Sequence, residues 1–255
     1  MIINRRTFIA TGASFGALTL AACSSDPVSK AEQQSSSSKT DTTTPAASTT
    51  DTTTTASTTP AADIQFYDGK PVPPIGKDPL LNPDGVKDRP IGAKNAKVIV
   101  IEYSSPTCPH CAAFALDVYP AFKKKYIDTG KITYILRPFV RNVLDAVVFM
   151  LADAAAPKDY VNVIETYFKT MNTWATSSKP RDEIEKIALQ LGFTKNSFEA
   201  ALTNQTLFDG LDKLRTQALD KFDVTGTPTF FINGTKFVGE HSLEQFSAAI
   251  DPLLA

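Results

Sequence analysis

The sequence predicts an α/β fold for residues 63–255, in the order strand, helix, strand, helical block, β-hairpin and final helix. Three observations carry this prediction. Two apolar runs rich in β-branched residues flank a helix-like stretch, apolar residues between positions 142 and 222 recur at three-to-four spacing, and an Asn-Gly pair separates two further strand-like runs. About 190 residues are enough for one well-buried domain. The helical block, at about 140–222, is therefore interpreted as an insertion within a single domain.

The first 22 residues have the pattern of a signal peptide, with a basic start, a short apolar segment at Ala13–Ala22 and small residues before Cys23. Arg5-Arg6-Thr7-Phe8 resembles the twin-arginine export motif, and Leu20-Ala21-Ala22-Cys23 resembles a bacterial lipobox. The lipobox resemblance implies cleavage before Cys23 and a diacylglycerol on its sulfur. Together with an N-acyl chain, this lipid would hold the protein stably on a membrane. The alternative is an ordinary signal peptide with an incidental cysteine.

Residues 23–62 consist mainly of Ser, Thr and Ala without apolar periodicity. Such a segment cannot bury enough surface to offset its ordering entropy, so we expect a disordered tether. The alternative is a low-complexity spacer whose length has no particular function, which explains the same composition. Residues 64–89 are rich in Pro, Gly and Asp and are predicted to be an irregular lead-in, with one edge strand near Ile64–Tyr67.

A βαβ unit follows the lead-in. Lys97–Tyr103 is an apolar run expected to form a buried strand, and Lys131–Arg137 is a second strand rich in β-branched and aromatic residues. The stretch between them predicts a helix that runs from Ala112 to about Ile127 and is kinked near Pro120. A strand, a helix and a strand within some forty residues are typical of a βαβ unit.

Helical periodicity extends from Asn142 to Phe222, where apolar residues recur at the spacing of helices that bury one face. Trp174 and the neighbouring Met and Phe residues are most simply core residues, and Gly192 is a natural helix end. The positions that carry the pattern are Ala146, Val147, Met150, Leu151, Val161, Ile164, Phe168, Met171, Ile184, Ile187, Ala188, Leu191, Leu207, Leu211, Leu214 and Leu219.

The C-terminal part predicts a hairpin and a helix. Thr229–Ile232 and Lys236–Val238 are strand-like and are joined by Asn233-Gly234, a strong signal for a tight hairpin turn. The last helix is expected over Ser242–Leu253. Its first residue is a good helix cap, and Gln245 three residues later completes a capping box.

The segment Cys108-Pro109-His110-Cys111 lies directly after the first predicted strand and opens the following helix. Two cysteines at this spacing can close a disulfide within one helical turn. Cys108 would lie at the helix N-terminus, where unpaired N–H groups and the helix dipole favour a thiolate. Because the thiolate is the form that attacks disulfides, the pattern predicts a redox-active pair with Cys108 as nucleophile and Cys111 as the resolving cysteine.

Composition excludes several other classes. The net charge is −1 with acids and bases interleaved, so nothing indicates a nucleic-acid partner. Of the three cysteines, Cys23 belongs to the N-terminus and two form the pair, which leaves none for structural disulfides. Zinc would need four ligands, whereas the folded part offers two cysteines and two histidines, one of them far away. Covalent haem would need a histidine where Ala112 stands. We therefore expect no metal and no cofactor other than the Cys108–Cys111 disulfide.

Residues 90–255 resemble the DsbA-like branch of the thioredoxin superfamily. The resemblance rests on Glu102-Tyr103 through Cys111, on the helical insertion, and on Gly226-Thr227-Pro228-Thr229-Phe230-Phe231-Ile232-Asn233-Gly234. It implies a thioredoxin fold with a helical insertion, in an exported lipoprotein form. It also implies a cis Thr227–Pro228 bond that faces the disulfide, so that Thr227, with Gly226 before it, offers backbone groups to a substrate strand. The alternative is a trans Pro228 that begins an edge strand.

Two departures from this family concern substrate handling. Oxidases of the best-known kind carry a valine before the cis proline, whereas this chain carries Thr227. Threonine at this position also occurs in isomerase-type relatives. Isomerases of that kind usually add an N-terminal dimerisation domain, and this chain has the predicted tether in its place.

Three further residues have candidate roles. His110 is expected to favour the Cys108 thiolate and so to make the disulfide oxidising; the alternative is an exposed spacer. Glu102 is expected to be partly buried under the pair with a raised pKa and to relay a proton to or from Cys111; the alternative is a solvated glutamate at a strand end. His241 is expected to be a surface or capping residue.

The predicted function is an exported, monomeric lipoprotein on the periplasmic side of the bacterial envelope that donates its Cys108–Cys111 disulfide to folding proteins with cysteine pairs. A membrane redox partner or a small-molecule oxidant would reoxidise it. One alternative is a reductase or isomerase kept reduced by a membrane electron donor. Another is a tethered peptide-binding or chaperone module without redox activity.

Overall fold

The computed structural model describes residues 64–73 and 75–255 of the chain. The predicted signal peptide (1–22), the lipidation site Cys23 and the tether (23–62) lie outside the described residues. Within the described part, no helix combines the length and the apolar character needed to cross a membrane.

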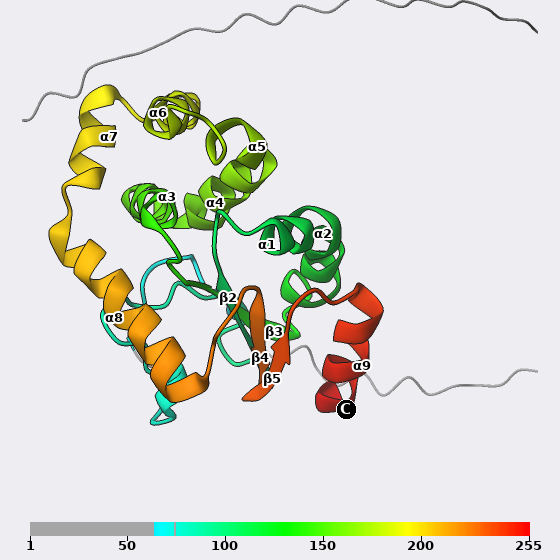
Figure 1. Cartoon of the computed structure of the whole chain (residues 1–255). Coiled ribbons are helices and arrows are strands. Elements are labelled where there is room, and N and C mark those ends of the chain that lie inside the picture. The colour runs from blue at the N-terminus through cyan, green and yellow to red at the C-terminus, as the bar shows by residue number, and fades with distance from the viewer. Residues whose placement is uncertain (1–63, 74) are drawn as a thin grey trace, which may run out of the picture. The chain divides into compact units, whose positions relative to one another are not determined.

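A five-stranded sheet in the order β1-β3-β2-β4-β5 forms the centre of the fold (Figure 1). β2 (Val98–Ser104) and β3 (Ile132–Pro138) are parallel, as the βαβ prediction requires. β4 (Thr229–Ile232) pairs antiparallel with β2, and β5 (Thr235–Val238) pairs antiparallel with β4. β1 (Ile91–Gly92) is a two-residue edge strand antiparallel to β3. The sheet confirms the predicted α/β order of the domain.

The alternation of β2 decides which of its side chains lie on the same side of the sheet as the cysteine pair. Val98, Val100 and Glu102 share one face of the strand, because successive side chains point to opposite faces. The two valines belong to the large apolar cluster that also contains Cys111, whereas Ile101 and Tyr103 belong to a smaller cluster on the other side of the sheet. Glu102 is therefore placed on the cysteine side of the sheet.

The helix after β2 is continuous from the cysteine pair to Ile127 but irregular. α1 (Pro109–Ala113) leads into a π-helical turn at Phe114–Val118, then α2 (Tyr119–Phe122) and a second π-helical turn at Lys123–Ile127. Pro120, the residue for which a kink was predicted, is the second residue of α2. A proline cannot donate to the carbonyl four residues earlier, and the wider turn before it accommodates the missing bond.

The predicted helical insertion is present between β3 and β4 (Figure 1). Its core includes Trp174, which is fully buried as expected and donates its indole N–H to the Tyr167 carbonyl at 2.9 Å. The helices of the insertion are α3 (Val143–Ala154), α4 (Tyr160–Lys169), α5 (Met171–Trp174), α6 (Pro180–Gln190), α7 (Lys195–Leu202) and α8 (Gln205–Phe222).

The C-terminal hairpin and helix also agree with the sequence prediction. Asn233 and Gly234 both have positive φ, 45° and 87°, as a two-residue turn of this type requires. α9 (Leu243–Leu254) begins after Ser242, whose hydroxyl accepts from the Gln245 N–H while the Gln245 side chain accepts from the Ser242 N–H. The capping box is confirmed.

The edge strand predicted near Ile64–Tyr67 is reduced to a single bridge. Phe66 forms an isolated antiparallel bridge with Ala93, flanked by two backbone hydrogen bonds, and the regular strand at that edge of the sheet is β1. Asp68 and Gly69 end the extended segment at once, because Gly69 turns the chain at a φ of 75°. A side chain at Gly69 would also meet the backbone of Pro157.

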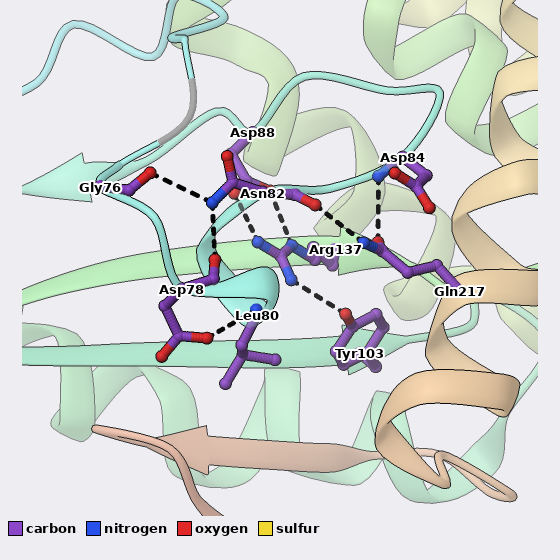
Figure 2. A network of polar contacts seen from close by, with 9 residues as sticks. All are labelled: Gly76, Asp78, Leu80, Asn82, Asp84, Asp88, Tyr103, Arg137 and Gln217. Carbon is purple, nitrogen blue, oxygen red and sulfur yellow. Dashed lines mark hydrogen bonds and ion pairs between the residues drawn. The ribbon is translucent and has the colours of Figure 1, made fainter.

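The lead-in is part of the folded domain, through the polar network drawn in Figure 2. Asp88 accepts two hydrogen bonds from the guanidinium of Arg137 on β3, at 2.8 and 2.6 Å, and Arg137 also donates to the Tyr103 hydroxyl at 2.9 Å. Gln217 on α8 donates to the Asn82 carbonyl at 2.8 Å and accepts from the backbone N–H of Asp84 at 3.0 Å. These bonds connect the lead-in to the sheet and to α8.

Candidate functional site

The cysteine pair occupies the position that the sequence predicts. Cys108 is the N-cap of α1, Pro109 is its first residue, and Cys111 lies one turn inside. Proline suits the first helical position, because the missing N–H has no partner there and its φ is already helical. Both thiols are free. Cys108 is only 2% exposed, slightly more than the fully buried Cys111, and it lines a cavity.

The surroundings of Cys108 favour its thiolate. The pKa of Cys108 is lowered from 9 to about 5, first because the Cys111 thiol can donate to it, and further through the backbone N–H groups of Cys111 and His110. These N–H groups belong to the first turn of α1, where they have no partner within the helix. Burial raises the pKa of Cys111 well above 9. The pair therefore holds one reactive thiolate and one protonated thiol at neutral pH.

The loop before β4 closes over Cys108. The Thr227–Pro228 peptide bond is cis, as the resemblance predicts. The Thr227 carbonyl oxygen lies 3.2 Å from Cys108 Sγ and accepts from the thiol. The Gly226 carbonyl accepts from the Thr229 hydroxyl at 2.7 Å and so fixes the loop. Thr227 Oγ1 is buried and has no hydrogen-bond partner among the described residues.

Glu102 is buried inside β2, paired with Leu136 and Phe230, and is not a solvated residue at the strand end. It is 1% exposed, and its carboxylate accepts a hydrogen bond from the Tyr134 hydroxyl on β3. Burial raises the pKa of Glu102 to about 7, against the opposing effect of the Tyr134 bond. The same carboxylate is near enough to raise the pKa of Cys111. A carboxyl group that titrates near neutrality beside a thiol can carry protons.

His110 is exposed and contacts a residue that the sequence did not single out. Its Nδ1 pairs with the carboxylate of Glu240, in the loop between β5 and α9. This hydrogen bond and the charge of Glu240 raise the pKa of His110 above its usual value. The pairing joins segments 130 residues apart, so no local sequence signal could have found it.

Replacing Glu240 with glutamine is expected to lower the pKa of His110 toward its ordinary value of about 6.5, because the charge of the partner is removed. An NMR pH titration of the His110 ring protons would measure the change. Glu244→Gln is the matched control, since Glu244 is an exposed carboxylate on α9 that interacts with Ser242. An unchanged pKa of His110 in the Glu240 variant would show that the pair does not form in solution.

Asp145 supports the loop that precedes Cys108, and sequence analysis missed it. Its fully buried carboxylate accepts from the Ser105 hydroxyl at 2.9 Å, from the Thr107 N–H at 2.8 Å and from the Arg141 N–H at 2.8 Å. Three hydrogen bonds stabilise a carboxylate that would otherwise be costly to bury. Asp145 thereby connects α3 to the turn between β2 and α1.

His241 is half-buried and is not the helix cap, so the capping role predicted as one alternative is wrong. Both ring nitrogens are buried without a hydrogen-bond partner among the described residues, and the ring packs on Phe237 and Phe246. The helix cap is the following residue, Ser242.

A cavity of about 550 Å³ opens beside Cys108. Among residues 64–73 and 75–255, no group of three or more His, Cys, Asp and Glu side chains is placed to hold a metal ion. The cavity brings Cys108, Pro109, His110, Gly226 and Thr227 together, whereas Glu102 lies beneath them in the core. Its lining residues are Cys108, Pro109, His110, Phe139, Arg141, Arg215, Leu219, Thr225, Gly226 and Thr227.

Comparisons with known proteins agree with this geometry. The family described as Thioredoxin matches residues 85–252. A Rickettsia felis protein that carries the name protein-disulfide oxidoreductase is 32% identical over 204 residues, which cover 76% of this chain and 73% of that protein. A Rickettsia typhi protein of the same name is 32% identical over 66% of this chain and 62% of its own length. The crystal structure of α-DsbA1 from Wolbachia pipientis is similar with a TM-score of 0.63 and 29% identity, over 66% of this chain and 90% of that one.

Proposed function

The chain belongs to the thioredoxin-like family of protein-disulfide oxidoreductases, and we propose that it introduces disulfides into folding proteins of the bacterial cell envelope. Its activity is thiol–disulfide exchange. The observation that supports the oxidising direction is the pKa of Cys108, which is lowered to about 5. A stabilised thiolate favours the reduced form of the enzyme, and a disulfide that is easily reduced is a strong oxidant.

The exchange would begin at the Cys108–Cys111 disulfide. A substrate thiolate attacks Cys108 Sγ, the Cys108–Cys111 bond breaks, and Cys111 leaves with the electron pair and takes a proton. The second substrate thiolate then attacks the substrate sulfur of the mixed disulfide and releases Cys108 as a thiolate. The substrate loses two electrons and the enzyme gains two, and the low pKa of Cys108 makes it a good leaving group. We propose that the disulfide itself is the only redox group the enzyme needs.

Three sets of residues would assist these steps. Glu102 would donate the proton that Cys111 takes up, because its carboxyl titrates near neutral pH and is close to that thiol. Gly226 and Thr227, on the loop with the cis Pro228, would hold the substrate segment as an added strand beside Cys108. Pro109 would assist by starting α1 directly after Cys108, and His110 would assist by favouring the Cys108 thiolate.

The location follows from the sequence pattern of the N-terminus. We propose export, cleavage before Cys23 and attachment of lipid to that cysteine, so that the enzyme works on the periplasmic side of a membrane and is reoxidised by a membrane partner. Growth with a labelled fatty acid would test the anchor. Label should enter the wild-type chain and be absent from Cys23→Ala, whereas equal labelling of both would contradict it.

The reduction potential decides between an oxidase and a reductase. Cys23→Ser leaves only the pair, and this chain would be equilibrated in glutathione buffers. We expect a value near that of DsbA, about −120 mV, whereas a value near that of thioredoxin, about −270 mV, would favour a reductase. A thiolate absorbance titration of the same sample should give a pKa of Cys108 near 5. Cys108→Ser should abolish exchange. Activity that survives it would support a non-redox peptide-binding module.

A further inference from the structure

The lining of the cavity beside Cys108 includes two arginines. Arg141 comes from the loop between β3 and α3, and Arg215 comes from α8, the long helix drawn in orange in Figure 1. Apolar groups line the same cavity. Phe139 is buried, Leu219 is half-buried, and the Arg215 guanidinium lies 5.9 Å from the centre of the Phe139 ring.

A second cavity, of about 230 Å³, lies on the far side of the two arginines. It shares Arg141 and Arg215 with the first cavity, so the pair forms the border between them. Its apolar lining includes Phe208, whose side chain is 42% exposed although it is large and hydrophobic. The lining residues are Val140, Arg141, Asn142, Ala146, Phe208, Leu211, Asp212 and Arg215.

The two guanidinium groups have no carboxylate partner among the residues that the structure describes. Neither forms an ion pair, although the three other arginines of the described residues, Arg89, Arg137 and Arg181, all do. Asp145 meets Arg141 only through the backbone N–H, and Glu240 is paired with His110. Asp212 is the one carboxylate in either lining, and it forms no ion pair with the arginines. The arginine pair is therefore positively charged and available to a ligand.

A carboxylate is the group that this pair fits. A guanidinium binds a carboxylate through two parallel hydrogen bonds, and such charge-assisted bonds are stronger than neutral ones. Arg215 is half-buried against an aromatic ring, so its charge is less screened than that of an arginine in open solvent. The apolar groups on either side favour a peptide that carries a hydrophobic residue near its acidic one.

We propose that the Arg141–Arg215 pair selects substrate segments in which an acidic side chain lies close to the reacting cysteine. This inference rests on the proposed function and adds the substrate class to it. The segment lies along the loop at Thr227 with its cysteine at Cys108, its carboxylate between the two arginines, and an apolar neighbour toward Phe208. Segments with lysine or arginine at the same place are disfavoured by repulsion between like charges.

The test compares three dithiol peptides that differ only in the residues flanking the first cysteine, which are Glu, Gln or Lys. The oxidised chain with Cys23→Ser is reacted with each peptide, and kcat/KM is measured by quenching and separating the products. Because flanking charges alter the reactivity of the peptide thiol itself, the quantity compared is the Glu-to-Lys ratio in one variant divided by that in another.

We expect the Glu-to-Lys ratio of kcat/KM to be about tenfold higher in the Cys23→Ser chain than in the same chain with Arg141→Gln and Arg215→Gln. Tenfold is the size of one charge-assisted contact. Arg141→Gln alone should lose part of it, and this variant changes only an exposed side chain. Arg141→Glu/Arg215→Glu should reverse the preference. Arg181→Gln, an exposed arginine on α6 that pairs with Glu199, is the matched control and should keep the ratio. Added salt should reduce the preference, because it screens the charges.

Two results would overturn the proposal. An unchanged ratio with unchanged rates in the arginine variants would show that the pair does not meet the substrate. An equal slowing for all three peptides would show that the arginines act on Cys108 and not on substrate choice. A low reduction potential with the charge preference intact would contradict the oxidase proposal alone, since the preference is measured within the exchange step.

Discussion

Replacing Glu102 with glutamine is expected to slow thiol–disulfide exchange by about 10²-fold and to stabilise the reduced protein above pH 7. The loss of rate follows from the loss of proton transfer to Cys111, since a positioned acid or base typically contributes about 10²–10⁴-fold. Glutamine keeps the size of the side chain and can still accept from the Tyr134 hydroxyl, so the change removes the titratable proton and little else.

The gain in stability comes from removing a buried carboxyl that is costly to ionise in the folded protein. The pKa of Glu102 is about 7 in the folded protein, against 4.5 for an ordinary glutamate. Below pH 4.5 the carboxyl is protonated in both states and costs nothing. Between pH 4.5 and 7 only the unfolded state ionises, so the free energy of unfolding falls as the pH rises. Each pKa unit is worth about 1.4 kcal/mol, so the full penalty above pH 7 is about 3 kcal/mol.

Urea unfolding of both reduced proteins at several pH values would measure this difference. The gap between the variant and the wild type should open between pH 4.5 and 7, where Glu102 ionises only in the unfolded wild type. Glu165→Gln is the matched control, because burial also raises the pKa of Glu165 but it lines a different cavity. A variant that stays fast, or a gap that does not change with pH, would contradict the role of the buried carboxyl.

Replacing Arg137 with methionine is expected to lower the free energy of unfolding by about 3–5 kcal/mol, the cost of leaving one member of a buried ion pair without its partner. The side chains of Arg137 and Asp88 are 1% and 5% exposed, and two hydrogen bonds join them (Figure 2). Loss of Arg137 would leave the Asp88 carboxylate and the Tyr103 hydroxyl buried without this donor.

A double variant separates the charge from the packing. Arg137→Met with Asp88→Leu removes both charges, so it should recover a large part of the loss, because apolar groups of similar volume replace buried pairs at little cost. Arg181→Met, which removes an exposed pair with Glu199, should cost less than about 1 kcal/mol. If the single variant at Arg137 were as mild as this control, the lead-in would not be held by the buried pair.

The sequence alone determined the features that depend on neighbouring residues. The position of Cys108 at the start of a helix follows from an apolar run on one side and helix-forming residues on the other. The turn at Asn233-Gly234 and the cap at Ser242 follow from backbone preferences within a few positions. The cis Pro228 came from the resemblance of a short segment to a known family.

The alternation of β2 also predicts the burial of Glu102. Val98, Val100 and Glu102 share one face of a strand that is otherwise apolar as far as Tyr103, and this pattern predicts a buried carboxyl facing the cysteine helix. The sequence predicted Glu102 to be partly buried, and the strand alone could have predicted its full burial. Its partner Tyr134 could not, because the contact depends on the register between β2 and β3.

Only the tertiary structure decided which distant residues meet. His110 and Glu240 are 130 positions apart, and Asp88 and Arg137 are 49 apart. Arg141 and Arg215 lie on a loop and a helix that the chain brings together only when the helical insertion folds back on the sheet. Local preferences act over a few residues, whereas these contacts depend on strand register and on how helices pack across a shared core. For that reason the sequence determined the reacting pair and its strand–helix frame, and the fold determined the groups that surround it.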